Sequence, residues 1–242
     1  MEAAAAFPCA SKATGLHELQ AEILHRDGAE IQLSWTFRDS LELWSTEIPE
    51  LPALRSYRRW LREQGGSENP SSMFEVHRSL APRQPELPAL QHRINRAVEN
   101  GKLGLLRPMN CLESHLLSFL AERSEIEAMR ELSAYVLTHP ERKEVRVYFL
   151  AGKGVFPPRD HLVKPRITED QSAGWVLAQH IHNHTVVFEE GERLFFPLAA
   201  PSTSDAQYAA AWAEAHLQRF IVLDGFSAGE IELESLLRFL EE

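Results

Sequence analysis

Cysteine is scarce in this chain of 242 residues, which has two, Cys9 and Cys111. Two cysteines are too few for a disulfide framework or for a zinc site with four cysteine ligands. Low cysteine usage is typical of proteins in a reducing cytoplasm. The opening residues, MEAAAAFPCASKATG, lack the basic leader and the long apolar run of a secretory signal peptide. We therefore expect a cytoplasmic protein.

Long apolar runs and an excess of positive charge are also missing. No stretch approaches the roughly 18 apolar residues of a membrane-spanning helix. The chain has 25 Lys and Arg against 35 Asp and Glu, a formal net charge of −10. Negative charge repels the phosphates of nucleic acids and of anionic lipids. We therefore expect neither a nucleic-acid partner nor a membrane partner, and the hydrophobic content of 44% fits an ordinary globular protein.

In the first hundred residues, the pattern predicts a mixture of strands and helices. Apolar and polar residues alternate over 30–38, which is typical of a half-buried strand, and we expect this strand to form a hairpin with residues 41–47. Residues 51–66 and 89–104 have the amphipathic pattern of helices that end at glycines. Residues 65–90 are rich in Gly, Ser and Pro and predict a loop.

The second part of the chain interleaves helices and strands. Residues 110–132 predict a helix, or two, with Asn110 as N-cap and Glu113 completing a capping box. Further strands are expected at 133–139, 145–152, 174–185, 192–198, 218–225 and 229–235, and helices at 204–217 and 235–242. This order indicates an α/β (α+β) fold, a mixed sheet flanked by helices. We expect an N-terminal accessory α+β region of unknown role at 1–100, followed by a second domain at 101–242.

Three histidines, His180, His182 and His184, occupy alternate positions of one expected strand. Residues two apart share a face of a strand, so their imidazoles can reach one metal ion. Two histidines with a distant carboxylate would leave one position of a tetrahedral zinc ion open, as in catalytic sites. The zinc deaminase signature and the H-E-x-x-H motif are absent. A cupin-like arrangement remains an alternative, in which His180, His182 and Glu189 bind the metal.

Two short segments together resemble the signature of the JAMM (MPN-type) zinc metalloprotease family. That signature is an upstream glutamate, then H-[ST]-H-P, then S-x-x-D. Here H-N-H-T stands at 182–185 and S-T-S-D at 202–205, preceded by Pro201. Asn183 replaces Ser or Thr, and Thr185 replaces Pro. The resemblance covers about residues 105–242, and an MPN-type sheet is the fold that it implies.

The resemblance also implies a site. His182, His184 and Asp205 would bind Zn²⁺, and His180 could take the place of His184. Glu131, just before an expected strand, would be the general base, with Glu144 and Glu113 as alternatives. Ser202 would donate a hydrogen bond to the oxyanion.

Members of the family hydrolyse peptide or isopeptide bonds, and often remove ubiquitin-like proteins from lysines. A protein substrate, a ubiquitin-like protein or its conjugate, is therefore the expected partner. The segment 185–201 is longer than its counterpart in the family, and its pattern predicts a hairpin that turns at Glu190 and Gly191. We expect this hairpin to pair with an extended substrate or to act as a lid. The alternative functions are a non-catalytic MPN-type scaffold and a cupin-like small-molecule metalloenzyme.

Overall fold

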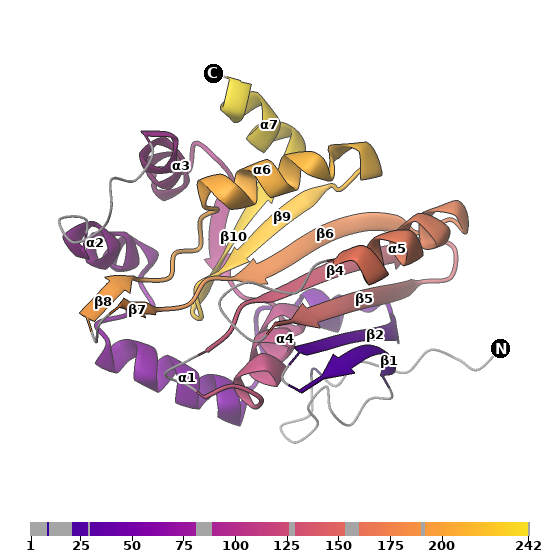
Figure 1. The fold of residues 1–242 in the computed structure, drawn as a ribbon, viewed down its shortest axis with the longest axis horizontal. Coiled ribbons are helices and arrows are strands. Elements are labelled where there is room, and N and C mark those ends of the chain that lie inside the picture. The colour runs from indigo at the N-terminus through magenta and orange to yellow at the C-terminus, as the bar shows by residue number, and fades with distance from the viewer. Residues whose placement is uncertain are drawn as a thin grey trace.

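A computed structural model describes Cys9 and residues 21–28, 30–80, 89–125, 129–152, 160–189 and 192–241. One mixed sheet of eight strands dominates this part of the chain, in the order β1-β2-β5-β4-β6-β9-β10-β3 (Figure 1). Its strands are β1 (Glu22–Asp27), β2 (Glu30–Arg38), β3 (Leu105–Pro108), β4 (Leu132–His139), β5 (Glu144–Ala151), β6 (Val176–Asn183), β9 (Arg219–Leu223) and β10 (Ser227–Glu232). Neighbouring strands are antiparallel except β6 and β9, which are parallel.

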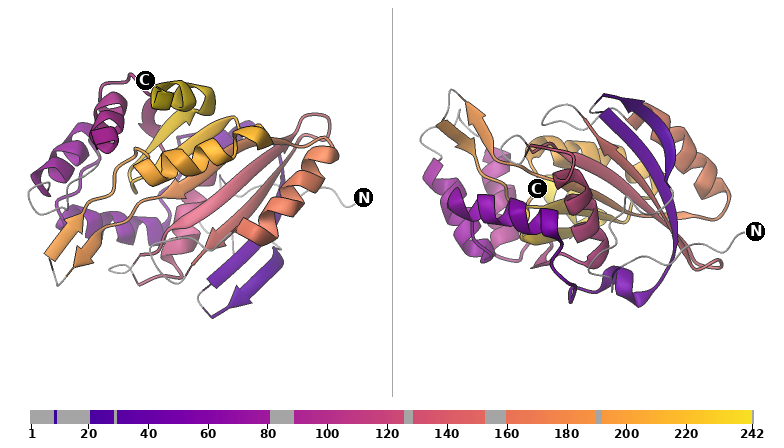
Figure 2. Two further views of the ribbon diagram at one scale, coloured as in Figure 1. Left: turned by 45° about the horizontal axis from the view of Figure 1, so that its top comes forward. Right: turned by 90° about the horizontal axis from the view of Figure 1, so that it is seen from below.

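Helices cover both faces of this sheet (Figures 1 and 2). They are α1 (Pro52–Glu63), α2 (Pro70–Leu80), α3 (Ala89–Glu99), α4 (Cys111–Ala121), α5 (Val163–Ser172), α6 (Thr203–Ala211) and α7 (Leu233–Glu241). Helix α4, in which every residue is buried, lies against one face of the sheet, and α5 and α6 lie over the other face. A separate small sheet pairs β7 (Val187–Glu189) with β8 (Glu192–Phe195). The α+β class is therefore confirmed. Within the described part of the chain, no helix is long and apolar enough to cross a membrane.

Several local predictions are confirmed by the structure. Asn110 caps α4 and forms the capping box with Glu113. The strands expected at 133–139 and 145–152 are present as β4 and β5, which pair as a hairpin with Leu132 opposite Ala151. The segment after His184 forms the β7–β8 hairpin, although the expected turn at 190–191 lies outside the described residues. These features depend on short-range patterns, which a sequence displays directly.

Three local predictions are wrong. The helix expected over 110–132 ends at Ala121, and the described residues 122–125 and 129–131 are not helical. Strand β2 pairs with β1 on one edge and β5 on the other, so no edge is left for residues 41–47, and Leu41–Trp44 form a 3₁₀ helix instead. The expected loop at 65–90 contains helix α2. Pro70 is tolerated in α2 because the N–H groups of the first helical turn have no intrahelical acceptor. Met73 and Phe74 lie on the inner face of α2 and are buried.

Strands from both expected parts of the chain share the same sheet and core. Strand β2, from the first hundred residues, pairs along its length with β5 of the second part. On the buried face of β2, Trp35 packs edge-on against Phe119 of α4 and Phe149 of β5. The boundary expected near residue 100 therefore does not coincide with a break in the sheet.

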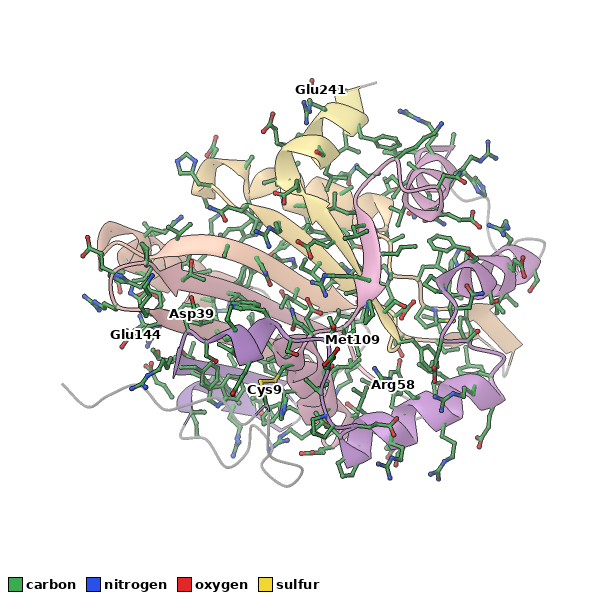
Figure 3. The ribbon with its side chains drawn as sticks, turned by 180° about the vertical axis from the view of Figure 1, so that it is seen from behind. Cys9, Asp39, Arg58, Met109, Glu144 and Glu241 are labelled. Carbon is green, nitrogen blue, oxygen red and sulfur yellow. A yellow bond between two sulfur atoms is a disulfide. The ribbon has the colours of Figure 1, made fainter. Side chains whose placement is uncertain are left out.

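The two cysteines form a disulfide bond. Cys9 and Cys111 are joined with their Cα atoms 5.8 Å apart, and the bond attaches the N-terminal segment to the first residue of α4 (Figure 3). Disulfide bonds are rare in reducing compartments. The bond therefore does not favour the cytoplasmic location that the low cysteine count led us to expect, and the location stays a prediction.

Candidate metal centre

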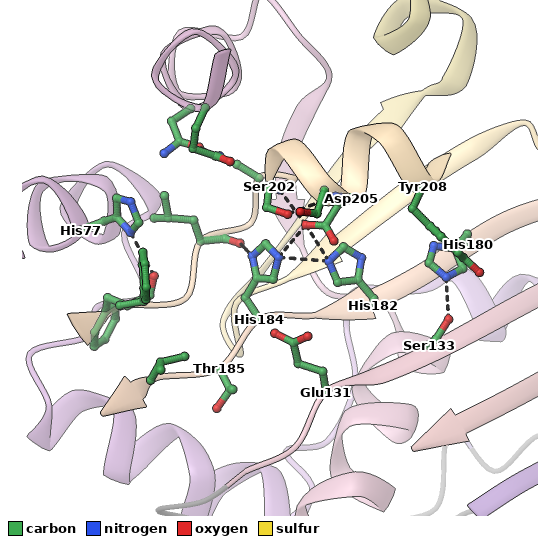
Figure 4. Close-up of a pocket in the computed structure, with 18 of the residues that line it drawn as sticks. His77, Glu131, Ser133, His180, His182, His184, Thr185, Ser202, Asp205 and Tyr208 are labelled. Atoms are coloured by element: carbon green, nitrogen blue, oxygen red, sulfur yellow. Dashed lines mark hydrogen bonds and ion pairs between the residues drawn. The ribbon is translucent and has the colours of Figure 1, made fainter. Parts of the chain in front are cut away.

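Strand β6 and the residue after it position the two histidines of the H-N-H-T segment. His182 belongs to β6, and His184 follows the last residue of the strand. The backbone N–H of His184 donates to the carbonyl of Leu223 in β9 at 2.9 Å, so the extended path continues by one more residue. His182 and His184 consequently point to the same side, toward the start of α6 (Figure 4).

The start of α6 places a carboxylate in front of these imidazoles. Ser202 is the N-cap of α6, and its Oγ accepts a hydrogen bond from the backbone N–H of Asp205 at 3.1 Å. In return, the backbone N–H of Ser202 donates to Asp205 Oδ2 at 2.7 Å. This capping box fixes the Asp205 side chain, and the positive end of the helix dipole favours its negative charge.

Three ligand atoms converge at this point. Asp205 Oδ2 lies 3.0 Å from His184 Nε2 and 3.3 Å from His182 Nε2, and the two Nε2 atoms are 3.1 Å apart. Two ligand atoms at about 2.0 Å from one tetrahedral ion would be separated by roughly 3.3 Å. The spacing of His182, His184 and Asp205 therefore fits a single metal ion without rearrangement, and these residues form a group that could hold one.

The tautomer of His184 also suits a ligand. Its Nδ1 lies 3.1 Å from the backbone carbonyl oxygen of Leu198. Because a carbonyl can only accept a hydrogen bond, Nδ1 carries a proton, and the lone pair of neutral His184 is then on Nε2, which faces Asp205. Ligating histidines commonly have such a hydrogen bond on the other ring nitrogen.

The charges of Asp205 and His184 shift each other's pKa. Burial lowers the pKa of His184, but the hydrogen bond to Asp205 and the charges of Asp205 and Glu131 outweigh it and raise the pKa to about 9. For Asp205, burial raises the pKa, but the charges of His182 and His184 and their hydrogen bonds bring it well below its usual value. The carboxylate therefore stays ionised and available to a cation.

The three glutamates that the sequence offered as general base lie in different places. Glu131, immediately before β4, lines the same cavity of about 630 Å³ as the three ligand residues. Glu144 is at the far end of the β4–β5 hairpin, opposite His139. Glu113 is buried and bound by the guanidinium of Arg107 and the backbone N–H of Asn110. The structure thus brings Glu131 to the cavity and leaves Glu144 and Glu113 away from it.

Burial perturbs Glu131 in a way that suits proton transfer. Burial raises its pKa to about 7, although the positive charge of His184 opposes the shift and the negative charge of Asp205 adds to it. A carboxyl group with such a pKa exchanges protons readily near neutral pH. Ser202 lines the same cavity, and because its Oγ accepts from the N–H of Asp205, its hydroxyl proton is free to point elsewhere.

His180, the third member of the histidine row, is not part of the cluster. Its side chain is buried, with 2% exposure. Nε2 of His180 lies 2.6 Å from Ser133 Oγ, and its ring stacks on Phe220. Burial, with a contribution from the charge of His182, lowers its pKa to about 3, so His180 is neutral. It forms part of the cavity wall beside the cluster.

Several residues of the cavity wall were missed by the sequence analysis. His77 of α2 and Gln91 and Asn95 of α3 come from the region expected to be accessory, and Asp160 and Tyr208 line the wall near His180. No local pattern could have identified them, because contacts over more than a hundred residues bring α2 and α3 to the site. Comparisons with protein-family models, with curated proteins and with solved structures find no match to this chain.

Proposed function

We propose that this chain is a zinc-dependent, JAMM-like peptidase or isopeptidase that processes ubiquitin-like proteins or removes them from their conjugates. The convergence of His182, His184 and Asp205 beside Glu131 and Ser202, in one cavity, is the observation that supports this function. These five residues are the ones that the resemblance to the JAMM family singles out. They come from three separate segments of the chain, so their meeting in space is independent of the motif itself.

Zinc is the metal that this donor set suits best. Two imidazole nitrogens and one carboxylate oxygen are typical of catalytic zinc sites, in which a fourth position is left for water. A zinc ion bound by His182, His184 and Asp205 would supply a Lewis acid and would lower the pKa of a water molecule to near neutrality. The cavity beside the three ligands gives a substrate access to that position.

Glu131 and Ser202 would divide the remaining chemistry between them. Glu131, with its pKa raised to about 7, takes a proton from the attacking water and later delivers it to the amine that leaves. The Ser202 hydroxyl donates a hydrogen bond to the oxygen that becomes negative in the tetrahedral intermediate. Loss of one such donor typically costs about 10²–10³ in rate. In this way Glu131 moves protons and Ser202 stabilises charge, and neither is a metal ligand.

The cavity extends on both sides of the metal centre. One side is lined by Phe195 and Phe196, at the end of the β7–β8 hairpin, together with residues of α2 and α3. The other side is lined by His180, Asp160 and Tyr208. A substrate bound across the centre would therefore contact the inserted hairpin, which supports a role for the hairpin in substrate pairing or as a lid.

The cupin-like alternative has less support. Its metal site requires a closed barrel with His180 and His182 converging, whereas the eight-stranded sheet has β1 and β3 at two separate edges. His180 also binds Ser133 rather than joining the cluster. A non-catalytic scaffold and an enzyme would both have this fold, so the two functions are distinguished by experiment.

The test combines metal analysis with a cleavage assay. We expect about one zinc per chain, as a single cluster of three ligands would hold, and loss of the zinc in His182→Ala and Asp205→Ala. Zinc-loaded protein should cleave fusions of ubiquitin-like proteins. Glu131→Gln should bind zinc normally but lose at least about 10² in kcat, while Glu144→Gln serves as the matched control and should retain full activity.

Three results would contradict the proposal in different ways. A chain that binds no zinc lacks the metal centre. A chain that binds zinc tightly but cleaves none of a panel of ubiquitin-like fusions and lysine conjugates is better described as a scaffold. Full activity in Glu131→Gln would show that another group is the base.

A further inference from the structure

We propose that Gln91 and Asn183 are positioning residues, each of which uses its side-chain carboxamide to fix the backbone on both sides of one catalytic residue. Asn183 holds the peptide groups around Glu131, and Gln91 holds those around Ser202. This inference rests on the proposed function, and it gives the N-terminal helix α3 a direct part in building the site.

Asn183 lies between the two histidine ligands, on the opposite face of β6. Its side chain is fully buried, with 0% exposure. Asn183 Oδ1 accepts a hydrogen bond from the backbone N–H of Leu132 at 2.7 Å, and Nδ2 donates to the backbone carbonyl of Arg130 at 3.2 Å. These two peptide groups precede and follow Glu131, so the carboxamide holds the backbone of Glu131 from both sides.

The end of the pairing between β4 and β6 explains why a side chain, and not the backbone, makes these hydrogen bonds. The antiparallel pairing of β4 with β6 ends at Ser133, which lies opposite His182. Beyond that pair, β6 keeps a neighbour among the described strands only on its other edge, where it pairs with β9 and the N–H of His184 donates to Leu223. The carboxamide of Asn183 has the same donor and acceptor groups as a peptide bond, so it continues the ladder for one step. Serine or threonine at this position has a single oxygen and could not span both peptide groups equally.

Gln91 makes the corresponding pair of bonds around Ser202. Its Oε1 accepts a hydrogen bond from the backbone N–H of Thr203 at 2.6 Å, and Nε2 donates to the backbone carbonyl of Pro201 at 3.1 Å. Nε2 also donates to Asn95 Oδ1, one turn further along α3, at 2.8 Å, which orients the carboxamide. Pro201 and Thr203 are the residues on either side of Ser202, the proposed oxyanion donor.

The two arrangements share one pattern. In each, the carboxamide donates to the carbonyl of the residue before the catalytic residue and accepts from the N–H of the residue after it. Both contacts are to backbone, so the side chains of Glu131 and Ser202 remain free for substrate. A catalytic group displaced by about 1 Å can lose about 10² in rate, so such fixation has catalytic value.

The experiment compares three conservative substitutions that remove a carboxamide. Asn183→Leu and Gln91→Met keep side-chain size and lose the hydrogen bonds. Gln171→Met is the matched control, because Gln171 also bonds a backbone carbonyl, that of Ala215, at 2.6 Å, but does not line the cavity. We expect kcat to fall about 10²-fold in the first two variants, with KM and zinc content unchanged, and no loss in the control.

Double variants separate positioning from a merely structural role. Once Ser202→Ala has removed the oxyanion donor, adding Gln91→Met should change kcat by no more than about twofold, because nothing is left to position. Asn183→Leu should likewise cost little in a Glu131→Gln background. Fully additive losses, or kcat values in the single variants equal to that of the control, would overturn the proposal.

Hydrogen exchange tests the same contacts without activity. In zinc-loaded wild type, the amides of Leu132 and Thr203 should be protected, and Asn183→Leu and Gln91→Met should each expose one of them selectively. If the wild type cleaves nothing but shows this pattern of protection, the proposed function is wrong and the backbone contacts are still supported. If the amides of Leu132 and Thr203 are unprotected in the wild type, the contacts themselves are wrong. If Asn183→Leu does not fold, Asn183→Ser takes its place, with the same expected fall in kcat.

Discussion

The disulfide between Cys9 and Cys111 allows a quantitative prediction for stability. It closes a loop with a sequence separation of 102 residues. In the chain-entropy model, a bond that closes a loop of about 100 residues restricts the unfolded chain by roughly 4.7 kcal/mol. A chain of this size loses about 2–4 °C in Tm per kcal/mol, so breaking the bond should lower Tm by roughly 10–20 °C.

The assay is thermal unfolding of the wild type with and without a reductant. Cys9→Ser should show the low Tm in both conditions, which controls for effects of the reductant itself. Neither cysteine lines the metal-site cavity, so zinc content should be the same with the bond open or closed. Mass spectrometry that confirms the bond, combined with a Tm that falls by less than about 2 °C on reduction, would refute the entropic reasoning. Two free thiols in the oxidised protein would refute the bond.

Three further predictions concern pH, packing and the inserted hairpin. Burial lowers the pKa of His115 to about 4. The unfolded chain therefore binds more protons between pH 6.5 and 4, so acidification over this window should cost up to about 3 kcal/mol, and His115→Gln should flatten the pH dependence of urea unfolding. A Cβ on Gly229 would lie 1.9 Å from the carbonyl oxygen of Ala199, so Gly229→Ala should lower the unfolding free energy by about 1–3 kcal/mol in urea titrations. Deletion of residues 187–197 should change kcat/KM for protein substrates, and unchanged cleavage of every substrate tested would remove the role proposed for the hairpin.

The sequence predicted those parts of the site that depend on local pattern. Alternation along one strand indicated that His182 and His184 share a face, and they do. The S-T-S-D segment placed Ser202 and Asp205 at the start of a helix, where the structure has them, although the capping box that they form there was not predicted. Each of these features is determined by the geometry of one helix or one strand, which a few neighbouring residues reveal.

The parts that were missed depend on distant contacts. Helix α2 was missed because it begins with one proline and two serines, while the apolar contacts of Met73 and Phe74 are supplied by other segments. The alternation of apolar and polar residues in β2 predicts a strand, but it does not show which strands lie beside it. Gln91 is an ordinary polar helix residue in the sequence, and its function in the site depends on Pro201 and Thr203 more than a hundred residues away.

Asn183 shows how a departure from a motif can be informative. By comparison with the family signature it was a substitution, because Ser or Thr is usual between the two histidines. In the structure its amide joins two segments that must meet for Glu131 to face the metal ligands. The residue is therefore explained by its contacts rather than by the motif.

A single oxygen, Asp205 Oδ2, joins the first turn of α6 to the imidazoles of His182 and His184. Tyr208, one turn further along the same helix, donates a hydrogen bond from its hydroxyl to Asp160, which lines the cavity beside it. Helix α6 therefore contributes to the candidate metal site with its first turn and to the cavity wall with the next.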